Sequence, residues 1–215
     1  LPKNKEFEDI LSKNDKYKKN HFRKNVDKHQ KRVVLFVSRE HGLRVLNGIL
    51  TSGKYRVIQV FTHALIPKSQ DPYNTIRHEY YDFMGKCYNE SIPCYQVDSK
   101  EKPLDVLECD FIVETSWRYL IPKSITSKAR ILAFGIHRGK LPDYAGGRPI
   151  KQALEKDDKE IILSAHDLSS SEIDMGKVLL TEKYKIKKRD EDHIRDDINP
   201  LFPKLALHVL DKFSK

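Results

Sequence analysis

Residues 32–53 read RVVLFVSREHGLRVLNGILTSG, and this stretch decides the fold. Residues 33–37 form an unbroken β-branched and aromatic run, which is typical of a strand covered on both faces. Apolar side chains then recur at helical spacing from Leu43 to Leu50, and Gly53 supplies a stop signal. The stretch therefore predicts a central parallel strand followed by a helix that packs on the sheet.

The same alternation continues along the chain. Further short apolar runs predict strands at 57–61, 92–95, 110–115, 129–134, 161–166 and 178–186. Helical patterns lie between several of them, Pro149 opens a further helix, and an amphipathic helix from Phe202 to Phe213 closes the chain. We expect an α/β fold, with a Rossmann-like, mostly parallel sheet and helices on both faces.

The chain has 215 residues and a net charge of +9, a size that suits one domain and a charge that favours anionic partners. Residues 1–32 alone contribute +6 of this charge and offer little to bury. We therefore divide the chain into a basic N-terminal extension, 1–31, and a catalytic domain, 32–215. Residues 1–32 suit either a weak contact to RNA or an exposed, solvated segment.

Several classes of protein are disfavoured by the sequence. No apolar run approaches the roughly 18 residues of a membrane span, so we expect no membrane contact. The cysteines, Cys87, Cys94 and Cys109, lack the spacing of a disulfide framework or a metal site, and we expect neither a metal nor an oxidising compartment. The predicted location is cytoplasmic. Glycine-rich nucleotide loops and a GxSxG elbow are absent from the sequence.

Residues 134–149, FGIHRGKLPDYAGGRP, are the most unusual segment. We expect His137 to follow the fifth strand on a loop, because ligands of open α/β sheets bind beyond the carboxyl ends of the strands. Asp174 lies between the last two predicted strands, where a carboxylate that approached His137 would orient the imidazole and stabilise its protonated form. The pair is a candidate acid/base site, although a loop histidine is more often structural.

The segments HRGKLPDYAGGRPI and EIDMGKVLL resemble sequence motifs of the formyltransferases that use N10-formyltetrahydrofolate. The shared positions are His137, Leu141, Pro142, Tyr144, Gly146, Pro149, Asp174 and Gly176. The resemblance extends from about residue 32 to 186, and it implies a formyltransferase fold and transfer of a formyl group to a primary amine. It also implies that His137 and Asp174 are catalytic.

One position departs from the family pattern. The family's catalytic asparagine falls on Gly135, which has no side chain to offer. The loss of one oxyanion donor typically costs about 10²–10³ in rate unless another group replaces it. A water molecule, Arg138 or a side chain from residues 115–117 is a candidate replacement. The alternative is a catalytically impaired homologue that binds folate or a nucleotide.

The resemblance also implies where the ligands bind. The formyl-folate is expected to contact Trp117, Arg118, Tyr119, Leu120, Ile121 and Leu168. The expected contacts of the amine substrate are Arg39, Arg138, Lys140, Tyr144 and Arg148. The arginines among them would suit a substrate that carries phosphate, because guanidinium groups bind phosphates in a bidentate manner.

Two features of the sequence bear on the choice of acceptor. A glycine-rich phosphate loop after the first strand is lacking, which argues against glycinamide ribotide, and no C-terminal barrel follows the closing helix, which argues against methionyl-tRNA. An amino sugar of a nucleotide-linked sugar is the expected acceptor, a truncated enzyme of the methionyl-tRNA type is the alternative, and self-association is left open.

Overall fold

The computed structural model describes residues 30–101 and 103–215. Apart from its last two residues, the predicted basic extension lies outside the described residues, so its contact with RNA stays a prediction. None of the helices in the described part has the length and apolar character that crossing a membrane requires.

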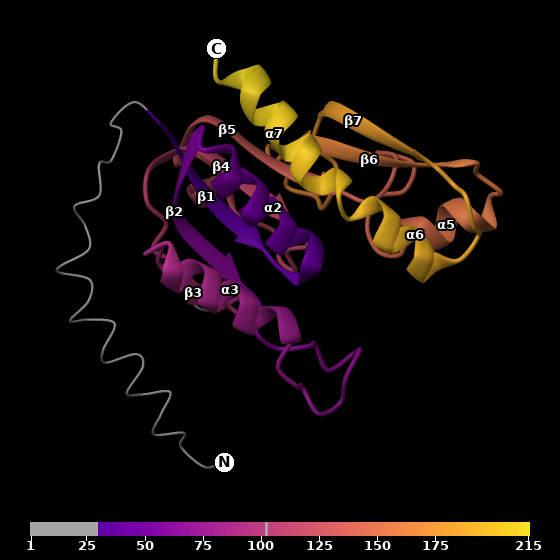
Figure 1. The fold of residues 1–215 in the computed structure, drawn as a ribbon, viewed down its shortest axis with the longest axis horizontal. Coiled ribbons are helices and arrows are strands. Elements are labelled where there is room, and N and C mark those ends of the chain that lie inside the picture. Colours follow the sequence, from indigo (N-terminus) through magenta and orange to yellow (C-terminus); the bar gives the residue numbers. More distant parts are fainter. Residues whose placement is uncertain (1–29, 102) are drawn as a thin grey trace.

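Within the described residues, the strands form one seven-stranded sheet in the order β3-β2-β1-β4-β5-β6-β7 (Figure 1). The strands are β1 (Lys31–Val37), β2 (Tyr55–Thr62), β3 (Cys94–Gln96), β4 (Cys109–Thr115), β5 (Ala129–His137), β6 (Glu160–Asp167) and β7 (Val178–Lys185). Strands β1 to β5 pair in parallel, whereas β6 and β7 pair antiparallel. The prediction of a mostly parallel sheet is confirmed.

One face of the sheet is covered by helices, as Figure 1 shows for α2 (Arg39–Ser52), α3 (His78–Asn89) and α7 (Leu201–Phe213). These helices bury their apolar stripes against the strands, and the largest fully buried side chains there include Phe83, Phe111 and Phe202. Helices α5 (Pro149–Glu155) and α6 (Glu191–Ile198) lie near β6 and the end of the sheet. The burial of this face is the main source of stability.

The opposite face is covered by α4 (Lys123–Thr126) and by loops. Here Val34, Phe36 and Ile112 of the central strands pack against Ile125 of α4 and against Val97, which follows β3. The sheet is therefore buried on both faces, as the continuous apolar runs of β1 and β4 require.

The structure corrects one boundary that bears on the site. Strand β5 ends at His137, so this residue closes a strand instead of standing on a loop. The strand is longer than predicted because β4 pairs with it up to Ile136 and β6 pairs with His137 from the other side. The longer strand holds the imidazole on a rigid element.

Candidate active site

A cavity of about 680 Å³ lies at the carboxyl ends of β1, β4 and β5. It is lined by both predicted catalytic residues, His137 and Asp174. The six residues predicted to contact the formyl-folate also line it: Trp117, Arg118, Tyr119, Leu120, Ile121 and Leu168. Of the predicted substrate contacts, Arg39, Arg138 and Arg148 line it. The structure thus brings most of the predicted site together in one crevice.

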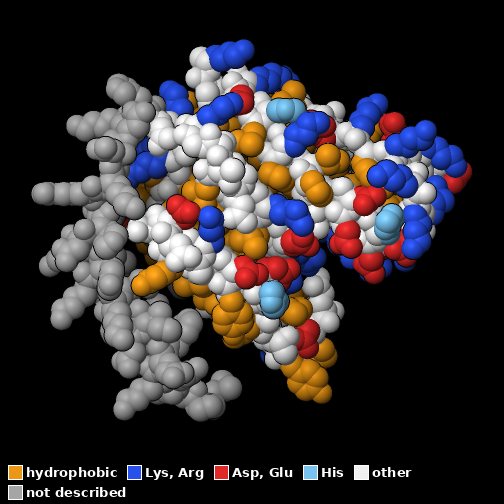
Figure 2. Space-filling model, viewed as in Figure 1, with side chains coloured by type: hydrophobic (Ala, Val, Ile, Leu, Met, Phe, Trp, Pro, Cys, Tyr) orange, Lys and Arg blue, Asp and Glu red, His pale blue; other side chains and the backbone are white. Residues whose placement is uncertain are grey.

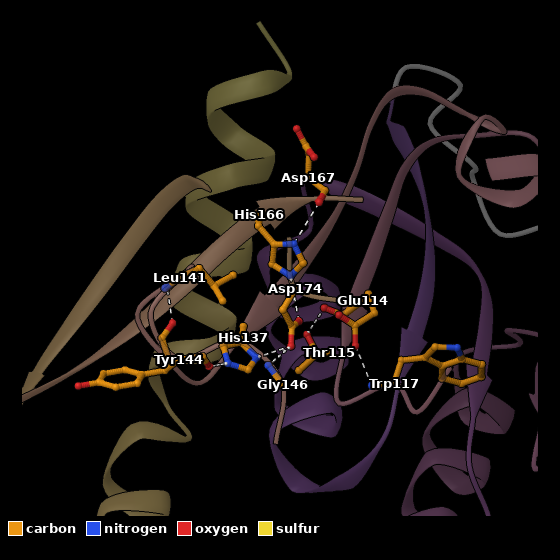
Figure 3. Close-up of polar contacts among 12 residues, drawn as sticks. Glu114, Thr115, Trp117, His137, Leu141, Tyr144, Gly146, His166, Asp167 and Asp174 are labelled. Atoms are coloured by element: carbon orange, nitrogen blue, oxygen red, sulfur yellow. Dashed lines mark hydrogen bonds and ion pairs between the residues drawn. The ribbon is translucent and has the colours of Figure 1, made fainter. Parts of the chain in front are cut away.

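Asp174 stands between two histidines at the centre of this cavity (Figure 3). Its Oδ2 atom is 3.2 Å from His137 Nδ1, and its Oδ1 atom is 3.5 Å from His166 Nε2. The backbone N–H of Gly146 donates to Oδ2 at 3.0 Å. These contacts hold the carboxylate at the end of β5, beside His137.

Both ring nitrogens of His137 face oxygen atoms. Its Nε2–H donates to the backbone carbonyl of Tyr144 at 2.7 Å, so Nδ1 and Asp174 Oδ2 need a proton between them. Burial lowers the pKa of His137, while the Asp174 charge and the Tyr144 carbonyl act in the opposite direction. The pair is consequently suited to take up and return a single proton.

The Asp174 loop is held by a close approach of two backbones. A Cβ atom at Gly176 would lie 1.8 Å from the carbonyl oxygen of Asp167, so only glycine fits there. Asp174 itself has a φ of 59°, in the left-handed region that L residues rarely adopt. Arg39, Ser116 and Arg148 also have φ near 60° and line the same cavity. Such strained residues gather at functional sites.

Aromatic side chains form one wall of the cavity. The Trp117 ring stacks on His63 with centroids 4.1 Å apart and meets Phe36 edge-on at 5.1 Å. Tyr119 packs edge-on against Trp117 at 6.1 Å. Burial lowers the pKa of His63 to about 4, so this ring is neutral at pH 7. The wall offers a flat, apolar surface to a planar ligand.

Arginines gather on another side of the cavity. Arg138 is largely buried, its Nη1 atom has no hydrogen-bond partner among the described residues, and its pKa is lowered to about 10 by burial and then by the charges of Arg39 and Arg195. Burial and then Arg195 lower the pKa of Arg39 as well. Like charges held together in a crevice favour an anionic ligand.

This cluster contrasts with the exterior. On the face drawn in Figure 2, Lys and Arg side chains are interspersed with Asp and Glu. Arg195, which donates to Glu191 Oε1 at 2.7 Å, was missed by the sequence reasoning because it belongs to α6, a helix that was not predicted.

Two predicted substrate residues do not line the cavity. Lys140 is exposed and pairs with Asp143 Oδ2 at 2.7 Å. Tyr144 is buried, and its hydroxyl donates to Asp158 Oδ2 at 2.6 Å, while its carbonyl receives the His137 hydrogen bond. The predicted substrate contacts of Lys140 and Tyr144 find no support in the structure. Tyr144 holds His137 in place instead.

A further cavity residue, Glu114 of β4, was missed by the sequence reasoning. It is the register partner of Gly135, and its Oε1 atom accepts the backbone N–H of Trp117 at 2.7 Å. The available signal was a carboxylate in DFIVET, a strand whose preceding three residues are fully buried and apolar. A charge in such a strand is uncommon unless it serves a site.

The fold and this histidine–carboxylate crevice are those of a class of α/β enzymes with the site at the ends of the strands. A family model described as formyl transferase matches residues 10–199, and the chain belongs to this family. The match begins within the predicted N-terminal extension.

Curated relatives agree with this family. The methionyl-tRNA formyltransferase of Orientia tsutsugamushi is 26% identical over 162 residues, covering 73% of this chain and 51% of the relative. That of Streptococcus sanguinis is 25% identical over 187 residues, covering 82% and 54%. The chain thus spans about half the length of the curated relatives it matches.

Solved structures show the same fold. Phosphoribosylglycinamide formyltransferase from Bacillus halodurans superposes with a TM-score of 0.64 at 19% identity, covering 86% of this chain and 97% of that one. A formyltetrahydrofolate deformylase from Pseudomonas syringae gives a TM-score of 0.63 at 20% identity, covering 86% and 63%. These likenesses support the α/β, Rossmann-like architecture.

Proposed function

We propose that this chain transfers a formyl group from N10-formyltetrahydrofolate to a primary amine, and that the amine belongs to a nucleotide-linked amino sugar. The observation that carries the reaction is the contact of 3.2 Å between His137 and Asp174 inside a cavity of a formyl transferase family member. The choice of acceptor is supported by the cluster of Arg39, Arg138 and Arg195 in the same cavity.

The lining of the cavity supports the binding of a folate. Trp117 and Tyr119 offer aromatic surface to a planar ring, and Leu168 and Ile121 extend the apolar wall. The formyl-folate, when bound, supplies the one-carbon group. The unpartnered Nη1 atom of half-buried Arg138, on the other side of the cavity, suits the anionic part of a second ligand.

His137 and Asp174 manage the proton of the reaction in this proposal. A primary amine must lose a proton as it attacks a carbonyl carbon, and the departing nitrogen must gain one. Nδ1 of His137 and Oδ2 of Asp174 lie 3.2 Å apart, so the two groups can pass a proton between them. The Tyr144 carbonyl keeps the ring oriented during this exchange.

The arginines favour an acceptor that carries phosphate. Besides burial, the charge of Arg195 lowers the pKa of Arg39, and the charges of Arg39 and Arg195 lower that of Arg138. A bound phosphate or pyrophosphate would relieve this repulsion. A nucleotide-linked sugar has such a pyrophosphate beside the sugar that bears the amine. Arg148, which also lines the cavity, is a further candidate contact.

The test is a panel of acceptors incubated with N10-formyltetrahydrofolate. Several nucleotide-linked amino sugars are compared with the same sugars lacking the nucleotide, and the acceptor's mass and the release of tetrahydrofolate are followed. We expect a gain of one formyl group on a nucleotide-linked acceptor. Formate release without a modified acceptor would contradict the transfer, and equal use of the free sugars would contradict the role of the phosphates.

Matched arginine variants sharpen this test. Arg138→Ala is expected to raise the KM for the nucleotide-linked acceptor by about tenfold or more, the loss of a charge-assisted contact. Arg44→Ala is the control, because Arg44 lies on the exposed side of α2 and pairs with Glu40. An Arg138→Ala enzyme with an unchanged KM would remove the cluster from acceptor binding.

Methionyl-tRNA is the second candidate acceptor, because curated relatives at 25–26% identity bear the name methionyl-tRNA formyltransferase. Charged initiator tRNA is therefore included in the panel. Its formylation, with the sugars untouched, would replace the acceptor proposed above and leave the reaction in place.

A further inference from the structure

Glu114 occupies the space that the side chain of residue 135 would otherwise fill. Gly135 lies opposite Glu114 in the pairing of β4 with β5, and a Cβ atom there would be 2.6 Å from Glu114 Oε2 and 3.0 Å from His166 Nε2. The carboxyl group thus reaches across the glycine to the centre of the site.

The two oxygens of Glu114 have different surroundings. Oε1 accepts the Trp117 backbone N–H at 2.7 Å, whereas Oε2 has no hydrogen bond within residues 30–101 and 103–215. Figure 3 shows the carboxyl group of Glu114 together with Asp174, His166 and His137 around the same space. Because Oε1 is the accepting atom, the hydroxyl of a protonated Glu114 is at Oε2 and faces the cavity.

The raised pKa of Glu114 favours its acid form at pH 7. Burial first, and the nearby charge of Asp174 second, raise its pKa to about 8, against the opposing effect of the Trp117 N–H. The ionisable groups that face it are His137 at the end of β5, His166 of β6 and Asp174 of the following loop. Its partner on β1 is Phe36, which carries no charge.

We propose that Glu114, as a carboxylic acid, donates a hydrogen bond from Oε2 to the formyl oxygen and so takes the part of the amide side chain that Gly135 lacks. This inference rests on the proposed formyl transfer. It makes Glu114 a catalytic residue, because its hydroxyl touches an atom of the reacting carbonyl.

The donor acts on charge that develops during transfer. The amine nitrogen forms a bond to the formyl carbon, and the C=O π electrons move onto the oxygen. That pair then re-forms the carbonyl as the bond to N10 breaks, N10 receives a proton, and the amine nitrogen loses one. Glu114 keeps its proton throughout and stabilises the oxygen while it is negative.

The experiment compares wild type, Glu114→Gln and Glu114→Ala over pH 6–10, with the acceptor identified by the panel above. We expect the wild-type kcat to fall with an apparent pKa near 8 as Glu114 ionises. Glu114→Gln keeps a neutral N–H donor, so it should retain kcat within about tenfold and lose this alkaline decline. Glu114→Ala should lose about 10²–10³ in kcat.

Two further measurements separate chemistry from folding. Glu108→Gln, an exposed glutamate just before β4, is the control and should leave the pH profile unchanged. Thermal unfolding of each variant verifies the fold. A ¹³C titration of the Glu114 side chain, assigned by its absence in Glu114→Gln, should give a pKa well above 4.5.

Several results would overturn the role of Glu114. They are an alkaline limb that persists in Glu114→Gln, an undiminished kcat in Glu114→Ala, or a side-chain pKa near 4.5. Failure of the proposed function looks different, since wild type would then neither bind 10-formylfolate nor use any acceptor. A wild type that binds 10-formylfolate with an affinity independent of pH between 7 and 9 counts against Glu114 alone.

Discussion

Gly176 lets the loop that carries Asp174 lie close to the backbone of Asp167. Gly176→Ala would drive a Cβ atom into the carbonyl oxygen of Asp167, 1.8 Å away, and the loop that carries Asp174 would have to shift. We expect a loss of about 1–3 kcal/mol in the free energy of unfolding, measured with urea, and a large fall in formyl transfer.

Gly85→Ala is the matched control for this variant. Gly85 lies in α3 with no atom within 4 Å of an added Cβ, so alanine should stabilise the protein by about 0.5–1 kcal/mol. Equal stability and activity of Gly176→Ala and wild type would show that the loop is not held as described.

In the proposed reaction, proton movement depends on His137. His137→Ala should lower kcat for formyl transfer by about 10²–10⁴, because the acid/base group is removed. His78→Ala is the control, since His78 is 91% exposed on α3. An unchanged kcat in His137→Ala would remove the imidazole from the mechanism.

At this scale the sequence predicts some site residues well and others not at all. His137 and Asp174 were predicted from sequence motifs that contain the reactive side chains themselves. In the structure, their side chains lie 3.2 Å apart. Glu114 does not follow, because its position beside Gly135 depends on strand register, which a sequence pattern does not specify. The contacts of Tyr144 depend on burial in the same way.

Among the elements, α7 provides the largest helical contribution to the core. Leu205 is fully buried on this helix, next to α2 and the strands, and Leu205→Ala should cost about 2–5 kcal/mol in the free energy of unfolding. Leu207 is half-buried on the same helix, so Leu207→Ala should lower the free energy of unfolding by less. Equal losses for Leu205→Ala and Leu207→Ala in urea denaturation would contradict the packing of α7.

The long apolar or amphipathic elements are predictable, and the exceptions have physical reasons. Helix α6 has only Ile194 and Ile198 buried among charged residues, so its sequence shows no clear helical pattern of apolar residues. Its one local signal is Asp190, whose side chain accepts the His193 N–H at 2.9 Å as an N-cap. The antiparallel direction of β6 could not be predicted from the sequence either, because the alternation of side chains along a strand is the same in both directions.

For the molecule as a whole, four histidines and Glu114 shape the dependence of stability on pH near neutrality. Burial lowers the pKa values of His41, His63, His137 and His166 below the ordinary value near 6.5. The unfolded chain therefore binds more protons below pH 6.5, and stability should fall as the pH is lowered from there.

Glu114 acts in the opposite sense. Its raised pKa means that the folded chain binds the extra proton between about pH 4.5 and 8, so this contribution to stability is lost as the pH rises through that range. We expect the highest unfolding free energy near pH 6.5–7, and Glu114→Gln should lose less stability than wild type between pH 6.5 and 9. Urea titrations at several pH values measure both, and parallel curves for the two proteins would contradict this assignment.

The reversal of direction at β6 also bears on biosynthesis. Glu114 and His137 already lie on the paired strands β4 and β5, whereas Asp174 follows β6 and joins them once β6 has paired antiparallel with β5. A nascent polypeptide still lacking that strand cannot assemble even a rudimentary reaction centre. Catalytic competence should thus appear late during translation, in one step with closure of the sheet, and prematurely terminated products should be inert.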